Sequence, residues 1–360
     1  MTLKKKLPLT FSIFLILSII SISSLSFANS KKYDVVAIGK AMVDLIQYTS
    51  EEELQKIMPS GFNKSDSTKI DEDTANKIQK QMHNVIIIPG GSEANVIANI
   101  GSLGGKTAFN AIVAEDELGI LFKKSLLKEN VDFLSPFTKD KSLRTARCFT
   151  FITPDKDRTF AVSDSIAKKM DDSFVNYDVI QNSKVFFTDA SNLNNKGNQN
   201  RITKKAIIIA KKSRTEVAFN LNNNHYIETY RNEIIELLPS IDIIFGSHIE
   251  AANLFKTDTL DRTISKYLEY VKIVIITLGK EGAVIATKEK RIHIPAVIKD
   301  PKKIIDLNGA GDGFTAGFLY GYTHNYGLYE SGVLASKTAS RIIRQTGARA
   351  TKSLKQAVLD

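Results

Sequence analysis

The stretch "DLNGAGDGFTAGF", from Asp306 to Phe318, places four glycines and two carboxylates at the start of an apolar segment with helical spacing. A glycine-rich turn that leads into a helix N-terminus directs backbone N–H groups toward an anion. A carboxylate inside such a turn would repel a bound phosphate, so Asp312 needs a role of its own. The stretch therefore predicts an anion-binding loop followed by a buried helix.

Phosphoryl transfer would give both features a use. Backbone amides of residues 308–311 would stabilise the charge on a moving phosphoryl group, and Asp312 would accept the proton of the attacking alcohol. A dinucleotide-binding turn is less consistent, because that turn follows the first strand of its domain. The remaining alternative is an aspartate in the first turn of an ordinary helix with packing glycines.

A second glycine-rich segment reads "PGGSEANVIANIGSLGG", from Pro89 to Gly105. Gly90 and Gly91 permit a close approach of a ligand to the backbone, and Ser92 is expected to cap the helix that follows. Asn95 would lie in the first turn, where its amide offers a donor and an acceptor to a hydroxyl. The alternative is a simple turn followed by a capped helix.

A carboxylate also follows the first predicted strand, in "IGKAMVDLI". Asp44 is expected at the carboxyl edge of the sheet, where open α/β folds bind ligands. There it could accept two hydrogen bonds from a vicinal diol. The alternative is an aspartate in a surface turn.

Short β-branched runs alternate with amphipathic segments through most of the chain. This alternation predicts an α/β fold with a doubly wound, largely parallel sheet. The predicted strands are Tyr33–Ile38, Ala108–Val113, Lys184–Thr188, Glu216–Asn220, Asp242–Phe245 and Ile273–Thr277, with an antiparallel pair at 283–287 and 291–297. The predicted helices are Glu117–Lys128, Gln199–Lys212, Glu228–Leu238 and Ile249–Leu254.

Two segments interrupt this alternation. Residues 42–84 and 144–162 are predicted to be extended or irregular, without companion helices. The second is predicted to be a hairpin with its turn at Pro154–Asp157. Together they predict a small β-sheet over one end of the main sheet.

Composition narrows the class of partner. The formal charge is +10, but the Lys and Arg residues are scattered and no basic run is interleaved with aromatics. We therefore expect a solvated basic surface, or a pocket for an anionic nucleotide, and no nucleic-acid partner. Cys148 is the single cysteine, so no intrachain disulfide is possible.

Residues 1–29 are predicted to be a leader outside the fold, which leaves residues 30–360 as the folded domain. Three lysines precede an uncharged stretch, a pattern typical of a signal peptide, and the apolar residues 7–28 are also long enough to span a bilayer. Export, a membrane anchor and a misassigned start codon all remain open.

Taken together, these motifs resemble those of the ribokinase-like carbohydrate kinase family, also called the PfkB family, with the adenosine kinase and fructokinase-like bacterial branch nearest. The two signatures of that family correspond to "GGSEANVIANIGSLGG" and "DLNGAGD", and "TLGKEGAVI" and the late "GAR" follow in the same order. The resemblance implies a three-layer α/β/α sandwich with a small β-sheet lid. It also implies transfer of the γ-phosphate of ATP, with Mg²⁺, to a hydroxyl of a sugar or nucleoside.

The resemblance also implies residue roles. Asp312 would be the catalytic base, and Arg147, on the lid, would reach a phosphate. The other implied roles are the anion hole at Gly309, Ala310 and Gly311, the substrate contacts at Asp44, Gly90, Gly91 and Asn95, and the nucleotide contacts at Thr277 and Gly279.

Several positions depart from the family pattern. Glu250, which would organise magnesium through water, is present, but Ser247 stands where asparagine is usual, so weaker metal organisation is expected. Lys40 replaces an asparagine of adenosine kinase-like members, which favours an anionic or different sugar over adenosine. Glu93 is a bulky acid beside the diglycine, and Leu307 replaces a threonine.

The sequence thus predicts an ATP- and Mg²⁺-dependent sugar or nucleoside kinase. Because the reaction needs ATP, we expect a cytosolic catalytic domain, with membrane anchoring or export as the alternatives. The lids of the family often pair between subunits, so a homodimer is also expected. The alternative function is a weakened or non-catalytic nucleoside- or sugar-binding protein with the same fold.

Overall fold

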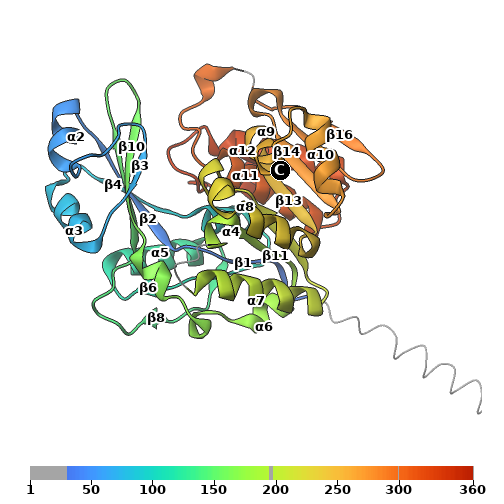
Figure 1. Cartoon of the computed structure of the whole chain (residues 1–360), viewed down its shortest axis with the longest axis horizontal. Coiled ribbons are helices and arrows are strands. Elements are labelled where there is room, and N and C mark those ends of the chain that lie inside the picture. The colour runs from blue at the N-terminus through green and yellow to red at the C-terminus, as the bar shows by residue number, and fades with distance from the viewer. Residues whose placement is uncertain (1–30, 194–197, 299, 360) are drawn as a thin grey trace, which may run out of the picture.

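The computed structural model describes residues 31–193, 198–298 and 300–359. It contains a nine-stranded sheet, a five-stranded sheet and a two-stranded pair. Figure 1 shows the five-stranded sheet and its two helices on the left, beside the larger body. The leader expected at residues 1–29, and the membrane contact expected at 7–28, lie outside the described residues. No helix in the described ranges combines the length and hydropathy needed to cross a bilayer.

The nine-stranded sheet confirms the predicted parallel core. Its order is β16-β15-β14-β13-β12-β11-β1-β5-β7. β15 is antiparallel to both of its neighbours, β14 and β16, which includes the predicted antiparallel pair, and the other neighbouring strands are parallel. The strands are β1 (Tyr33–Ile38), β5 (Thr107–Asn110), β7 (Val131–Phe133), β11 (Ser183–Asp189), β12 (Glu216–Asn220), β13 (Ile243–Ser247), β14 (Ile273–Thr277), β15 (Ala283–Ala286) and β16 (Arg291–Ile294). The strand expected at Ala108–Val113 is divided: β5 ends at Asn110, and a separate β6 (Val113–Ala114) pairs with β8 (Phe137–Thr138).

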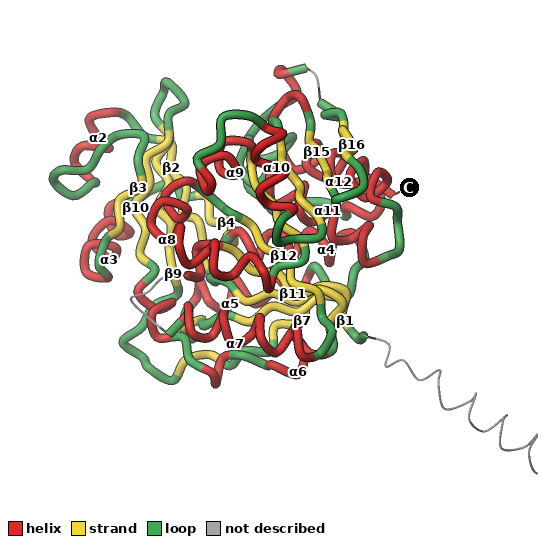
Figure 2. The backbone as a smooth tube through the Cα atoms, turned by 45° about the vertical axis from the view of Figure 1, so that its right-hand side comes forward, coloured by secondary structure: helices red, strands yellow, loops and turns green. Residues whose placement is uncertain are grey.

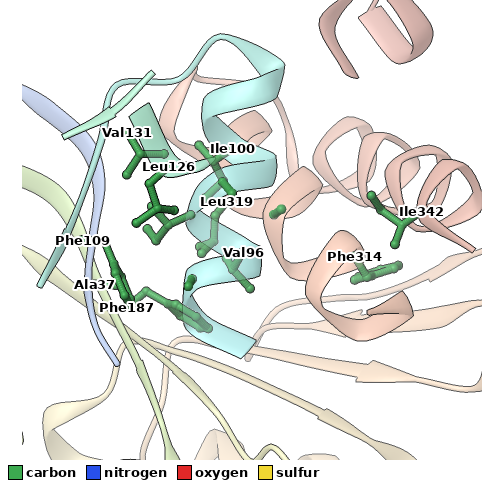
Figure 3. Close-up of a cluster of buried hydrophobic side chains, with 14 of the residues drawn as sticks. Ala37, Val96, Ile100, Phe109, Leu126, Val131, Phe187, Phe314, Leu319 and Ile342 are labelled. Atoms are coloured by element: carbon green, nitrogen blue, oxygen red, sulfur yellow. The ribbon is translucent and has the colours of Figure 1, made fainter. Parts of the chain in front are cut away.

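Helices cover both faces of this sheet, which gives three layers. One face is packed by α4 (Ser92–Leu103), α5 (Glu117–Lys128), α11 (Ala310–Thr323) and α12 (Leu328–Ile342). The other is packed by α6 (Tyr177–Gln181), α7 (Gln199–Lys212), α8 (Asn224–Leu237), α9 (His248–Phe255) and α10 (Leu260–Leu268). Strand alternation explains the two cores, because Val35 and Ala37 of β1 belong to the first and Val36 and Ile38 to the second. Figure 3 shows the first core, where Val96, Leu319 and Ile342 extend from three different helices.

The glycines of α11 allow it to pack closely against α12. A Cβ added at Gly317 would lie 2.7 Å from the Cα of Ala335, and one at Gly321 would lie 3.0 Å from the Cα of Ser331. Both glycines recur at a four-residue interval on one helix face, which brings the two backbones together. This packing holds the N-terminus of α11 in a fixed position beside the main sheet.

The small sheet has the order β3-β10-β9-β2-β4. Its strands are β2 (Met42–Tyr48), β3 (Ser67–Lys69), β4 (Ile86–Gly90), β9 (Ala146–Ile152) and β10 (Arg158–Ser163). The β9–β10 pair is antiparallel, as the predicted hairpin requires. In Figure 2 this sheet stands at the edge of the body, flanked by α2 and α3.

The prediction that residues 42–84 lack helices is wrong. The segment contains α2 (Glu51–Ile57) and α3 (Glu72–Gln81). Ser50 and Asp71 cap them by accepting hydrogen bonds from backbone N–H groups in the first turn, and acidic residues follow each cap. Each helix buries only two side chains, so most of its sequence is polar and the helical period is hard to see.

Short helical turns complete the structure: η1 (Ser165–Lys169), η2 (Asp172–Phe174), η3 (Ala190–Leu193), η4 (Leu238–Ser240), η5 (Gly279–Glu281), η6 (Pro301–Lys303) and η7 (Lys355–Leu359).

Candidate active site

A cavity of about 350 Å³ lies between the inner face of the small sheet and the N-termini of α4 and α11. A second cavity, of about 410 Å³, surrounds residues 307–312 and shares Asn308 and Asp312 with the first. A third, of about 470 Å³, shares Ala310 and Gly311 with the second. The three spaces therefore follow one another past the glycine-rich loop.

Asp312 lies where the first two cavities meet, in the first turn of α11. Its Oδ1 accepts a hydrogen bond from Ser92 Oγ at 2.8 Å, and its Oδ2 accepts one from Asn95 Nδ2 at 2.9 Å. Burial raises the pKa of Asp312 to about 6, and these two hydrogen bonds limit the rise. The carboxylate is thus held in one orientation and keeps a proton affinity suited to a base near neutral pH.

The expected helix cap at Ser92 is wrong. The residue at the N-cap of α4 is Gly91, which makes no side-chain cap hydrogen bond, and Ser92 is the first residue of the helix. Its hydroxyl is bound to Asp312 instead. The sequence could not show this, because the two residues are 220 positions apart.

The predicted anion hole lies at the N-terminus of α11. Gly309 is the N-cap with a φ of 77°, and a Cβ there would lie 2.3 Å from the Cβ of Ala348, so glycine is required. In the described part of the chain, the N–H groups of Gly309 and Gly311 have no hydrogen-bond acceptor. The N–H of Ala310 donates to Leu307 O at 3.2 Å. The amides open to an anion are therefore fewer than the sequence suggests.

Asp44 belongs to the small sheet rather than to the exit of a main-sheet strand. It lies on β2 and lines the first cavity together with Gly91 and Asn95. A Cβ at Gly90 would lie 2.5 Å from Asp44 Oδ2, so the glycine makes room for this carboxylate. Burial raises the pKa of Asp44 to about 6, while the charge of Arg349 opposes the rise.

Arg349 organises this wall, and sequence reasoning gave it no role. Its guanidinium donates to Asn95 Oδ1 at 3.0 Å, to Gly90 O at 2.8 Å and to Ser125 Oγ at 2.7 Å. The side chain is buried, and burial lowers its pKa to about 10. The sequence motif that contains this residue is the "GAR" at 347–349, but its contacts appear only in the tertiary structure.

A third group of polar side chains lines the cavity where β1 passes to β2. Lys40 Nζ lies 3.4 Å from Asp164 Oδ2 and 5.6 Å from the ring centre of Tyr226. Beside them Glu93 is fully buried and accepts a hydrogen bond from Asn192 Nδ2 at 2.5 Å. Burial, and then the neighbouring Asp189, raise the pKa of Glu93 well above its ordinary value.

Arg147 does not reach this site, so the role expected for it is wrong. It points to the outer face of the small sheet, where it pairs with Glu72 of α3 and donates to Asn76 Oδ1 at 3.1 Å. Successive residues of a strand face opposite sides, and its neighbour Cys148 lines the cavity. The arginine that does line the cavity is Arg158, whose Nη2 lies 2.9 Å from Asp306 Oδ1.

The predicted nucleotide contacts line the third cavity. Thr277 ends β14 and Gly279 begins η5, opposite Ala310 and Gly311. Most of the remaining wall is apolar, formed by Val297, Ile304, Leu307, Phe314, Ala339 and Ile343.

Glu250 lies in the first turn of α9 and lines the second cavity. Its Oε2 accepts a hydrogen bond from the N–H of Ser247 at 2.7 Å, and Ser247 Oγ accepts one from the N–H of Glu250 at 3.3 Å. Ser247 therefore serves as a helix cap and orients the glutamate. Among the described residues, no group of three or more His, Cys, Asp or Glu is placed to enclose a metal ion.

Comparisons with known proteins agree with this architecture. Residues 32–355 match the family described as pfkB family carbohydrate kinase. An adenosine kinase structure from Sinorhizobium meliloti is 30% identical, with a TM-score of 0.81 over 91% of this chain and 98% of that chain. A probable sugar kinase structure from Rhizobium etli is 28% identical, with a TM-score of 0.81 over the same shares. The 5-dehydro-2-deoxygluconokinase of Geobacillus kaustophilus is 25% identical over 89% of this chain and 91% of its own length.

Proposed function

Since the chain belongs to the pfkB family of carbohydrate kinases and is a phosphotransferase, we propose that it transfers the γ-phosphate of ATP to a hydroxyl of a small sugar or nucleoside. The assignment of Asp312 as the base rests on the position of its carboxylate. It is fixed by Ser92 and Asn95 at the junction of a polar cavity and a glycine-rich helix N-terminus. A substrate in the first cavity would present its hydroxyl to this carboxylate.

In this proposal the proton of the substrate hydroxyl passes to Asp312 while the oxygen attacks the γ-phosphorus. Asp44 and Asn95 orient the substrate by hydrogen bonds to its other hydroxyls. Arg349 fixes Asn95, because its guanidinium binds the amide oxygen, so that one amide N–H donates to Asp312 and the other can donate to the substrate. This arrangement holds the reacting oxygen near the base.

The phosphates of ATP would lie against Gly309 and Gly311, whose N–H groups have no acceptor among the described residues and whose place at a helix N-terminus favours negative charge. The apolar third cavity, between Val297 and Phe314, would take the adenine ring. In this proposal the nucleotide occupies the second and third cavities, on the far side of the loop from the sugar.

The second cavity also fits a magnesium ion bound through water. Mg²⁺ retains several waters and needs only one or two carboxylates besides the phosphates, and Glu250 is oriented by Ser247 at this wall. When bound, the ion would neutralise charge on the phosphates. The side chain of Glu250 would hold its water ligands.

Two wider features of the protein are also part of the proposal. Ile86 and Ile87 are exposed on β4, at the edge of the small sheet, and their exposure favours pairing of the small sheets of two copies. Catalysis with ATP favours a cytosolic location for the catalytic domain.

The test is release of ADP from ATP with a panel of sugars and nucleosides. Asp312→Asn is expected to lower kcat by about 10²- to 10⁴-fold, the usual contribution of a general base, while the melting temperature stays close to that of the parent protein. Asp258→Asn, at an exposed surface ion pair, is the matched control and should keep full activity.

An Asp312→Asn variant with activity within about threefold of the parent would exclude this carboxylate as the base. Ligand-dependent stabilisation without turnover of any substrate would instead support a non-catalytic binding protein.

A further inference from the structure

The cavity contains a cationic group that the reaction itself does not use. Lys40 and Lys69 both line it, and both ammonium groups face the same oxygen of Asp164, at 3.4 Å and 3.8 Å. One carboxylate thus lies between two cations. The three side chains together carry one positive charge in excess.

The ammonium of Lys40 also has unused hydrogen-bonding capacity. Its side chain is only 8% exposed, and among the described residues its single hydrogen bond goes to Asp164 at 3.4 Å, which is long for a hydrogen bond. A lysine ammonium has three donors. Two N–H groups of a buried charge therefore remain for oxygen atoms of a bound molecule.

The other charged groups around Lys40 do not cancel this excess within the cavity. Glu93 is buried beside Asp189. Burial and the charge of Asp189 both raise the pKa of Glu93, which favours its neutral form. Asp189 directs its oxygens to the N–H of Ser191, at 2.8 Å, and to the amide of Asn222, at 2.6 Å.

The remaining charges of the cavity have partners or roles elsewhere. Arg158 is paired with Asp306. Asp44 and Asp312 are directed at the reacting end of the substrate.

The charge of this wall disfavours a nucleobase. A flat base binds between apolar or aromatic surfaces, whereas here Lys40 lies against the ring of Tyr226 and presents its charge together with Asp164. An oxyanion satisfies both lysines, because it accepts hydrogen bonds from two ammonium groups at once.

We propose that the substrate is an acidic sugar whose carboxylate or phosphate binds Lys40 and Lys69. This inference rests on the proposed kinase activity. It adds that the specificity of the first cavity is set by charge, and that neutral sugars and nucleosides are poor substrates.

The experiment measures kcat/KM with matched pairs of substrates. One pair is an aldonic acid and the alditol of the same carbon chain; the other is an aldose and the same aldose with a terminal phosphate. Adenosine is included as the nucleoside. The two pairs separate carboxylate from phosphate recognition.

In the parent protein the acidic member of at least one pair should be preferred by about 10-fold or more, as expected for hydrogen bonds between charged groups. Lys40→Gln should lower kcat/KM for that acidic substrate by about 10- to 100-fold and change the value for its neutral partner by less than about threefold. Lys40→Arg should retain the preference. Lys290→Gln, an exposed lysine far from this cavity in the fold, is the control and should change neither value.

If Lys40→Gln is unstable, Lys69→Gln serves in its place, because this side chain is 57% exposed. Lys69→Gln should reduce the preference for the acidic substrate over its neutral partner by about threefold to 10-fold relative to the parent protein.

Turnover that favours a neutral sugar or adenosine would overturn the inference and leave the kinase activity standing. If no substrate is phosphorylated, the proposed function fails. In that case thermal stabilisation by each pair tests the inference separately, and equal stabilisation by acidic and neutral members overturns it.

Discussion

The two walls of the substrate cavity are built on different principles. The wall formed by α4 and α11 is held by contacts between distant segments: Asp312 is bound to Ser92 and Asn95, and Asn95 to Arg349. The wall formed by the small sheet consists of alternate strand residues, among which Arg158 is tied to the opposite wall through Asp306. The first wall is suited to chemistry, which needs fixed geometry. In the second wall, substitutions of side chains that face the cavity would change which substrate binds.

The largest effect is expected when Arg349, which anchors the first wall, is removed. Arg349→Met leaves Asn95 Oδ1 and Gly90 O without their donor, and the free energy of unfolding should fall by about 3–5 kcal/mol, as when one partner of a buried charged network is removed. Denaturation with urea measures the change. Arg344→Met, an exposed arginine five positions earlier, is the control and should be neutral.

A loss below about 1 kcal/mol in Arg349→Met would show that the anchor contributes little. Arg349→Lys should recover only part of the stability, because a single ammonium cannot reproduce the fork that binds three acceptors.

The pH dependence of activity distinguishes the carboxyl groups of the two walls. Burial raises the pKa of Asp312 and of Asp44 to about 6 in each case. A base must be ionised to accept a proton, so kcat/KM should fall as the pH decreases through about 6, more steeply than about tenfold per pH unit if both groups must be ionised. In Asp44→Asn the acid limb should be reduced to about tenfold per unit, from Asp312 alone. An unchanged slope in this variant would exclude Asp44 from the ionisations that activity requires.

The smallest expected effects concern the two arginines on opposite faces of the small sheet. Arg158→Met removes the link between the walls, and kcat/KM should fall by about 10-fold. Arg147→Met removes a contact to Glu72 on the outer face; it should lower stability by about 1–3 kcal/mol and change kcat/KM by less than about threefold. Steady-state kinetics and thermal melting measure both. A larger loss of kcat/KM in Arg147→Met than in Arg158→Met would reverse the assignment of the two faces.

Sequence patterns predict the main sheet well, because its strands are buried on both faces and therefore consist of continuous apolar runs. β14, "IVIIT", is predicted with the bounds that it has in the structure. The glycine-rich entrance to α11 is equally visible, since the backbone conformation at Gly309 limits the choice of residue.

The small sheet is predicted less well, and the reasons are physical. In β9, buried residues occupy both faces because α3 covers the outer one, so alternation cannot show that Arg147 points away from the cavity. α3 itself was missed because its sequence is largely polar. Contacts such as that between Arg349 and Asn95 join residues 254 positions apart and follow from the packing of whole elements.

Arg349 follows every strand of the main sheet in chain order, and this order has a consequence for synthesis. A chain emerging from the ribosome can form the main sheet and α4 before residue 349 is made, but until then Gly90 and Asn95 lack the guanidinium that binds them. Nascent and truncated chains that stop before this arginine would therefore neither bind substrate firmly nor consume ATP. Competence would be acquired only after residue 349 has been made and has bound to Gly90 and Asn95.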